Sequence, residues 1–233
     1  IAAIRTLKEI EASGLAATPQ QQKTLAGYSG WGGIPQVFDE SNAKWSSEYA
    51  ELKALLTNEE YESARASTPN AHYTSPEVIK TIYTALASFG FEGGRVLEPS
   101  MGVGGFFALY PQQWREKSEL HGVELDSVSG RIGQLLYPSA HITIEGFENV
   151  PLEADEFDVA VGNVPFGTYQ LYDPEFNKHN LLIHDYFFAK ALSKVRPGGI
   201  LAFITSKGTL DKENAKFRQY LAQRARLIGA IRL

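Results

Sequence analysis

Hydrophobic positions in the first part of the chain recur every three or four residues, which is the spacing of an amphipathic helix. Ile4, Leu7 and Ile10 would share one face of such a helix. Proline at a first helical position and a Thr-x-x-Glu capping box indicate where later helices start. Helices are expected at 1–12, from Pro19 onward and over 46–66, with a new start at Thr57. These patterns predict a helical N-terminal extension, residues 1–69.

The second part of the chain alternates between helical segments and short apolar runs. Ser75 followed by Pro76 predicts a helix start, and Gly90 predicts its end. Runs rich in valine, isoleucine and leucine are typical of strands buried in a parallel sheet. Strands that alternate with helices predict an α/β fold with a doubly wound, parallel sheet. Strands are expected at 95–98, 120–124, 141–144, 159–162, 200–205 and 227–231, and the last helices at 181–195 and about 213–226.

Composition is that of a globular protein, with 233 residues, 43% hydrophobic and 21% charged. The absence of cysteine excludes disulfides and cysteine-based zinc sites, and no metal site is expected. No apolar run approaches the ~18 residues of a membrane span and no signal peptide is found, so a cytoplasmic location is expected. The chain begins at Ile1 without methionine and is expected to be a piece of a longer polypeptide.

Charge is distributed unevenly along the chain. The net charge of −5 does not favour a free-standing DNA-binding protein. From Lys207 to Leu233, however, seven lysines and arginines stand against two acids. A solvated helix face and a DNA-binding patch both account for this basic segment.

A glycine-rich run, Glu98-Pro99-Ser100-Met101-Gly102-Val103-Gly104-Gly105-Phe106, separates the first strand from its helix. Open α/β sheets bind ligands at this position, and glycines let backbone N–H groups approach a ligand closely. The dinucleotide pattern Gly-x-Gly-x-x-Gly is not met, because Phe107 stands where its third glycine would be. The run also lacks the Lys-Ser/Thr pair of a P-loop. A valine in place of Gly104 is expected to block the crevice.

Two further polar positions follow predicted strands. Glu124 ends the second strand, 20 residues after Gly104, and a carboxylate there can accept both hydroxyls of a ribose. Asn163-Val164-Pro165-Phe166 follows the fourth strand. An amide, a carbonyl and a ring at this place can hold a flat polar base, because the ring stacks and the oxygens accept from an amino group. A strand end followed by a proline turn is the alternative interpretation.

These motifs resemble, in their order and spacing, those of methyltransferases that use S-adenosylmethionine to modify adenine in DNA. The run from Glu98 to Phe106 resembles motif I of that family, and Asn163-Val164-Pro165-Phe166 resembles motif IV, with Val164 in place of its first proline. Tyr73-Thr74, before the helix at Pro76, resembles motif X. The resemblance covers residues 70–233 and implies a class I, Rossmann-like methyltransferase domain there. Its seventh, antiparallel strand is expected to lie outside this chain.

The resemblance also implies roles for individual residues. The Asn163 side chain and the Val164 carbonyl would accept from the adenine amine, and Phe166 would stack on a base flipped out of the duplex. Val164 keeps that carbonyl but is expected to loosen the backbone. Phe147 or Glu148 would contact the cofactor adenine. The implied catalytic residues are Asn163, Val164, Pro165 and Phe166, and the implied cofactor-binding residues are Tyr73, Thr74, Glu98, Pro99, Ser100, Gly102, Gly104, Phe106, Glu124, Leu125, Phe147 and Asn163.

The version of these motifs found here looks closest to a methylase-like domain of very large proteins of phages, plasmids and conjugative elements, where it is fused to a helicase. The Gly30-Trp31-Gly32-Gly33 loop also resembles that group, and is either a packed turn or a cover for the active site. Implied partners are DNA and the remaining domains of a longer polypeptide. A catalytically silent module that binds DNA or cofactor, and a glutamine or RNA substrate, are the alternatives. His184 is expected to be structural or exposed, and Asp185 to be a helix N-terminal acid.

Overall fold

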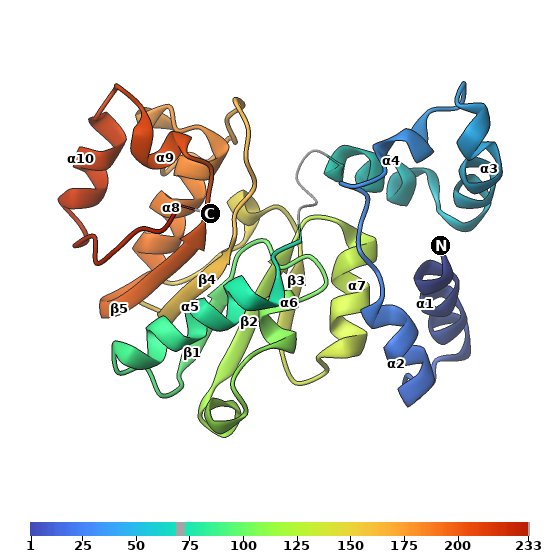
Figure 1. The fold of residues 1–233 in the computed structure, drawn as a ribbon, viewed down its shortest axis with the longest axis horizontal. Coiled ribbons are helices and arrows are strands. Elements are labelled where there is room, and N and C mark those ends of the chain that lie inside the picture. Colours follow the sequence, from blue (N-terminus) through green and yellow to red (C-terminus); the bar gives the residue numbers. More distant parts are fainter. Residues whose placement is uncertain (69–72, 233) are drawn as a thin grey trace.

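The protein is described here by a computed structural model that covers residues 1–68 and 73–232 (Figure 1). Its centre is a five-stranded sheet in which every neighbouring pair is parallel. The strand order is β3-β2-β1-β4-β5, so the order reverses between β1 and β4. The predicted doubly wound α/β fold is therefore confirmed. The strands are β1 (Arg95–Glu98), β2 (Glu119–Glu124), β3 (His141–Ile144), β4 (Phe157–Asn163) and β5 (Val195–Ile204).

Helices cover both faces of this sheet because successive strand residues point to opposite sides. Val96 and Val159 pack with α5 and α6, whereas their neighbours Leu97 and Ala160 pack with α8. None of the helices in the described residues is both long and apolar enough to span a bilayer. The helices of this part are α5 (Pro76–Ser88), α6 (Gly105–Ala108), α7 (Ser127–Leu136), α8 (Ile183–Lys194), α9 (Gly208–Asp211) and α10 (Lys216–Ala222).

The N-terminal extension is helical, as predicted, and lies beside α7 (Figure 1). Its helices start where the sequence indicates. Thr18 and Thr57 each accept from the backbone N–H three residues later, and Gln21 and Glu60 complete the capping boxes. The elements are α1 (Ala2–Ser13), α2 (Pro19–Ala26), α3 (Ser46–Leu55) and α4 (Asn58–Ser67), with 3₁₀ turns at Pro35–Phe38 and Ala43–Trp45.

Three expectations about the C-terminal part are wrong. Residues 227–231 form no strand, and Leu227, Ile228 and Ile231 are exposed, because an apolar run becomes a strand only where its backbone pairs with a neighbour. The last helix is shorter than expected. The Arg-Pro-Gly-Gly stop at 196–199 does not separate α8 from the fifth strand. It lies inside β5 as an irregularity, where the pairing register with β4 shifts.

Candidate active site

The glycine loop after β1 bends through two glycines in the left-handed region. Gly102 has φ 57° and Gly104 has φ 82°, conformations that residues with a Cβ rarely adopt. The Gly102 N–H donates to Glu124 Oε2 at 2.7 Å, which joins the loop to the end of β2. A Cβ on Gly102 would project into open space, whereas one on Gly104 would overlap the Tyr137 ring. Gly102 therefore borders open space, while Gly104 permits close packing against the end of α7.

Two carboxylates, Glu98 and Glu124, end the neighbouring strands β1 and β2 beside this loop. Glu98 ends β1 and is 2% exposed, and its Oε2 has no hydrogen-bond partner among the described residues. Burial, and then the neighbouring Glu124, raise the pKa of Glu98 well above its usual value. Burial also raises the pKa of Glu124 to about 7, although backbone N–H donors, including that of Asp126 at 2.8 Å, oppose the shift. Such a pair is stabilised by a ligand that donates hydrogen bonds or carries positive charge.

The end of β4 lies directly beside the glycine loop. Ser100 Oγ donates to the Asn163 carbonyl oxygen at 2.9 Å, which links the loops that follow β1 and β4. These two strands are neighbours at the point where the strand order reverses, which is where open α/β sheets bind ligands. Phe166 is half-buried and packs against the apolar cluster under α8. The structure thus brings Asn163 and Phe166 to the same edge as Glu98 and Ser100.

Val164 does not loosen this segment as expected. Its backbone N–H donates to the Ile204 carbonyl oxygen at 3.1 Å, and its side chain is buried. A proline has no N–H and could not make this bond. Valine at this position therefore extends the β4–β5 ladder by one more hydrogen bond.

Tyr73 approaches the carboxylates from the segment before α5. The residue is 49% exposed, yet burial around its hydroxyl and the charges of Glu124 and Asp126 raise the pKa of Tyr73. Thr74 is half-buried and precedes Ser75, whose Oγ accepts from the Val78 N–H at the start of α5. The residues just before Tyr73 in the motif lie outside the described part of the chain. The charge of Glu124 thus acts on the Tyr73 hydroxyl although the two residues are 51 positions apart in the sequence.

The remaining expected residues divide between the rim of the site and the core. Leu125 is 69% exposed on the rim, beside Glu124, and Pro99 packs against Gly162 of β4. Phe147 is 2% exposed and its ring lies 5.0 Å from that of Phe187, so it belongs to the core. Phe106 is also a core residue, and its carbonyl accepts from the Tyr83 hydroxyl at 2.8 Å.

Between Phe147 and Glu148, only Glu148 keeps part of its side chain accessible. The side chain is half-buried and folds back over Gly146, at the exit of β3. The Glu148 carbonyl accepts from Lys190 Nζ at 3.0 Å, which ties this turn to α8. The side chain that can meet a ligand at this turn is thus the acid.

The sequence patterns did not predict a buried polar cluster that lies near the end of β5. His184 and Asp185, in the first turn of α8, are both buried, and Lys212 donates from Nζ to Asp185 Oδ2. Lys212 Nζ also lies 3.3 Å from His184 Nε2. The helix N-terminal position expected for Asp185 is confirmed. No local signal indicates the pairing, because Lys212 is 27 residues away from Asp185.

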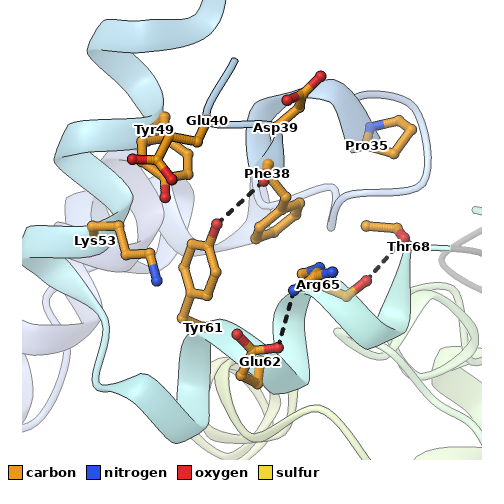
Figure 2. Close-up of a pocket in the computed structure, with 10 residues that line it drawn as sticks. All are labelled: Pro35, Phe38, Asp39, Glu40, Tyr49, Lys53, Tyr61, Glu62, Arg65 and Thr68. Atoms are coloured by element: carbon orange, nitrogen blue, oxygen red, sulfur yellow. Dashed lines mark hydrogen bonds and ion pairs between the residues drawn. The ribbon is translucent and has the colours of Figure 1, made fainter. Parts of the chain in front are cut away.

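A cavity of about 570 Å³ lies elsewhere, on the N-terminal extension (Figure 2). Lys53 Nζ stands 3.7 Å from the centre of the Tyr61 ring, and the Tyr61 hydroxyl donates to the Phe38 carbonyl at 3.4 Å. Acidic and basic side chains both line this hollow, and none of its lining residues belongs to the edge of the sheet described above. It is therefore distinct from the candidate active site.

Sequence comparison identifies a family and a longer relative. Residues 107–233, more than half of the chain, match the family model of the Eco57I restriction-modification methylase. The chain is 30% identical over 227 residues to the Defense against restriction protein B of Escherichia phage P1. That match covers 94% of this chain and 8% of the phage protein.

Solved structures share the fold at low sequence identity. A type I restriction-modification methyltransferase subunit from Streptococcus thermophilus superposes with a TM-score of 0.54 at 16% identity, covering 94% of this chain and 59% of that one. A class I S-adenosylmethionine-dependent methyltransferase from Listeria monocytogenes gives 0.52 at 15% identity, covering 95% and 78%. S-adenosylmethionine is the cofactor of this class. The chain belongs to the Eco57I restriction-modification methylase family and has the fold of a class I S-adenosylmethionine-dependent methyltransferase.

Proposed function

We propose that this chain transfers the methyl group of S-adenosylmethionine to the exocyclic amino group of adenine in DNA. The observation that carries the proposal is the hydrogen bond from Ser100 Oγ to the Asn163 carbonyl. It holds Asn163-Val164-Pro165-Phe166 against the glycine loop, so a base held by the first would meet a cofactor held by the second. Methyl transfer depends on this proximity and alignment.

The residues beside β1 and β2 fit the cofactor. Gly102 leaves open space where a side chain would stand, and Glu98 Oε2 is a buried acceptor with no donor among the described residues. The cofactor, when bound, supplies a methyl group on a positively charged sulfur. Glu124 would accept from the ribose hydroxyls, Leu125 would cover the adenine, and Tyr73 would close the site from the side of α5. The glycine loop around the cofactor would be shaped by Pro99, Ser100 and Gly104. Thr74 would line the cofactor site next to Tyr73.

Phe106 and Phe147 are both expected from the sequence to bind the cofactor, but their buried positions in the core support other roles. We assign Phe106 to holding the loop from below, and we assign the contact with the cofactor's adenine end to Glu148 rather than Phe147. An acid can accept from an amino group, whereas the Phe147 ring packs on Phe187.

On the substrate side, the chain's own residues position the target amine. The Asn163 side-chain oxygen and the Val164 carbonyl would accept its hydrogens, and this support strengthens as positive charge develops on nitrogen. The bond from Val164 N–H to Ile204 keeps that carbonyl in place. Pro165 restricts the backbone before Phe166, whose ring would stack on the flipped base.

Recognition of DNA is assigned to a larger polypeptide. The chain spans 8% of the length of the phage P1 relative, which supports further domains in a larger polypeptide. That one of them is a helicase is proposed from the resemblance of the motifs alone. We retain residues 70–233 as the catalytic domain and 1–69 as its extension. The position of Asn163 beside the glycine loop supports an enzyme over a silent module, because a silent module has no use for a target-amine site.

Transfer of isotope-labelled methyl from S-adenosylmethionine to duplex DNA tests the proposal. The full-length protein is incubated with matched duplexes that contain or lack adenine on one strand at the modified site. Label on the amino group of adenine is expected. Label on cytosine, on RNA or on a protein amide, or no label despite cofactor binding, would overturn it.

A further inference from the structure

The glycine loop is anchored in the N-terminal extension and not only in the sheet. Val103 stands between the two left-handed glycines and is 7% exposed. Its side chain belongs to one apolar cluster with Tyr28 and Trp31 of the extension and with Val128 and Ile132 of α7. The extension and the glycine loop therefore share a continuous core.

Polar contacts connect the same two parts. Glu60 of α4 is buried and accepts from Lys8 Nζ at 2.5 Å and from Arg131 of α7. At the start of α7, Asp126 accepts from Ser63 Oγ of the extension at 3.4 Å. The backbone N–H of Asp126 in turn donates to Glu124 Oε1. Two hydrogen bonds thus lead from α4 to the carboxylate at the centre of the site.

Tyr28 of the extension brings a hydroxyl group into the core that it shares with the glycine loop. The residue is 6% exposed, and its hydroxyl completes no hydrogen bond with any described residue, although Ser129 and Trp31 lie close enough to act on it. Burial, and then Asp126 and Tyr73, raise the pKa of Tyr28, so the group is a neutral hydroxyl. A buried hydroxyl without a partner is unfavourable and is usually satisfied by water or a ligand.

We propose that Tyr28 is a binding residue for the nucleoside half of S-adenosylmethionine, and that the Gly27–Gly33 loop of the N-terminal extension is a wall of the cofactor site. The inference rests on the proposed cofactor edge at Glu98 and Glu124. The nucleoside half is assigned because Tyr28 shares one apolar cluster with Val103 of the glycine loop and with Val128 of α7, the helix that follows the ribose-binding acid Glu124. The hydroxyl donates to an oxygen or ring nitrogen of the ligand, and Trp31 holds the ring of Tyr28 edge-on at 6.1 Å between centres.

Calorimetric titration of the protein with S-adenosylhomocysteine and with 5′-methylthioadenosine, which lacks the amino acid part, tests the proposal. Tyr28→Phe removes only the hydroxyl and is expected to weaken binding of both ligands about five- to tenfold. Tyr61→Phe is the matched control. Its hydroxyl lies in the same extension but bonds to Phe38 in the separate cavity of Figure 2, so both affinities should stay unchanged.

Amide hydrogen exchange of the wild-type protein provides a second measurement that does not depend on how the variant folds. S-adenosylhomocysteine is expected to slow exchange at 27–33 as well as at 101–105, and to leave α3 unchanged. Unaltered affinity of Tyr28→Phe, an equal loss in Tyr61→Phe, or no protection at 27–33 would overturn the proposal. A wild-type protein that binds neither ligand would instead overturn the cofactor edge on which the proposal rests.

Discussion

Some residues of the site leave space for a ligand, and others hold the backbone of the site in position. Gly102 and Gly104 look equivalent in the sequence, yet only Gly102 borders open space. A valine at Gly104 is therefore expected to disturb packing rather than to block the crevice, because its side chain would overlap Tyr137, the residue that follows α7. Conversely, Val164 strengthens the ladder that a proline would shorten.

Alanine at the two glycines should separate binding from stability. Gly104→Ala is expected to destabilise the protein by about 1–3 kcal/mol, because it combines overlap with Tyr137 and left-handed strain. Gly102→Ala should cost about 1 kcal/mol of stability. It should reduce cofactor affinity more than Gly104→Ala does, since its methyl group enters the open space beside the loop. Thermal unfolding and calorimetry with S-adenosylhomocysteine measure the two effects. Equal behaviour of both variants would contradict the assignment.

The raised pKa of Glu124 predicts a pH dependence of cofactor binding. Ribose hydroxyls donate to the ionised carboxylate, so protonation below a pKa of about 7 should weaken affinity. Affinity for S-adenosylhomocysteine is expected to fall about tenfold from pH 8 to pH 6. Glu124→Gln should bind more weakly throughout and show a flatter profile.

Ionisation of Glu124 favours cofactor binding but lowers the stability of the cofactor-free protein. Because the folded pKa of Glu124 lies above the unfolded value, its contribution to stability is present below about pH 4.5 and is lost as pH rises through about 7. Chemical denaturation without cofactor should show less of this loss in Glu124→Gln. A binding profile independent of pH in the wild type would contradict the role given to Glu124.

Asn163 and Phe166 should affect different steps. Asn163→Ala is expected to lower single-turnover methyl transfer by about 10²–10³ with little change in cofactor affinity, because its support grows with charge on the amine. Phe166→Ala should weaken capture of the flipped base by about 1–3 kcal/mol. Transfer of labelled methyl and cofactor titration on the same samples distinguish the two. Wild-type transfer rates in Asn163→Ala would remove this motif from the mechanism.

Among the elements, α8 begins beside the loop that follows the proposed base-binding residues Asn163 and Phe166. The Ile183 N–H donates to the Tyr169 carbonyl at 2.9 Å, and the next two residues, His184 and Asp185, are buried. Lys212, between α9 and α10, pairs with Asp185. This ion pair fixes the start of α8 against the end of β5, and so supports the base of the loop that follows Phe166.

Removal of the cation should therefore destabilise the fold strongly. Lys212→Met leaves the Asp185 carboxylate buried without its partner and is expected to cost about 3 kcal/mol. The double variant Lys212→Met with Asp185→Asn should recover most of this loss, because the stranded charge is gone. Denaturant unfolding of the three proteins gives the values. A double variant no more stable than the single one would argue against the ion pair as the cause.

In the whole molecule, the sheet stands between the N-terminal extension on one side and α8, α9 and α10 on the other (Figure 1). The extension contributes Glu60, which pairs with Arg131 of α7, and the last segment carries an excess of lysine and arginine. The net charge of −5 does not supply an electrostatic surface for duplex DNA by itself. We therefore propose that most phosphate contacts are made by the larger polypeptide.

Salt should distinguish the two binding events. DNA binding releases counterions from phosphates, so methyl transfer by the full-length protein at limiting DNA should fall steeply as salt rises from 50 to about 200 mM. Affinity for S-adenosylhomocysteine should change little, because its contacts are buried and local. Filter-binding and calorimetric titrations over one salt series provide the comparison. An equal salt dependence of DNA binding and of S-adenosylhomocysteine affinity would contradict this separation of the two binding events.

Local patterns in the sequence determine much of this protein. The helix start at Pro19, the capping box at Thr57 and the Ser75 cap depend on residues within a few positions of one another, and each appears in the structure as predicted. The alternation of strands with helices appears as predicted as far as β5. The glycine loop and Asn163 follow strand ends, and parallel strands place such ends along one edge. Their meeting there could therefore be predicted as well.

Only the tertiary structure decided which side chains face the site. Burial of Phe147, the pairing of Lys212 with Asp185 and the packing of Tyr28 in one apolar cluster with Val103 depend on elements far apart in the chain. The same holds for the apolar run at 227–231, which has strand propensity but no partner. Propensity and capping act through neighbouring residues, whereas burial and pairing depend on what the completed fold brings against each surface, and no local pattern carries that information.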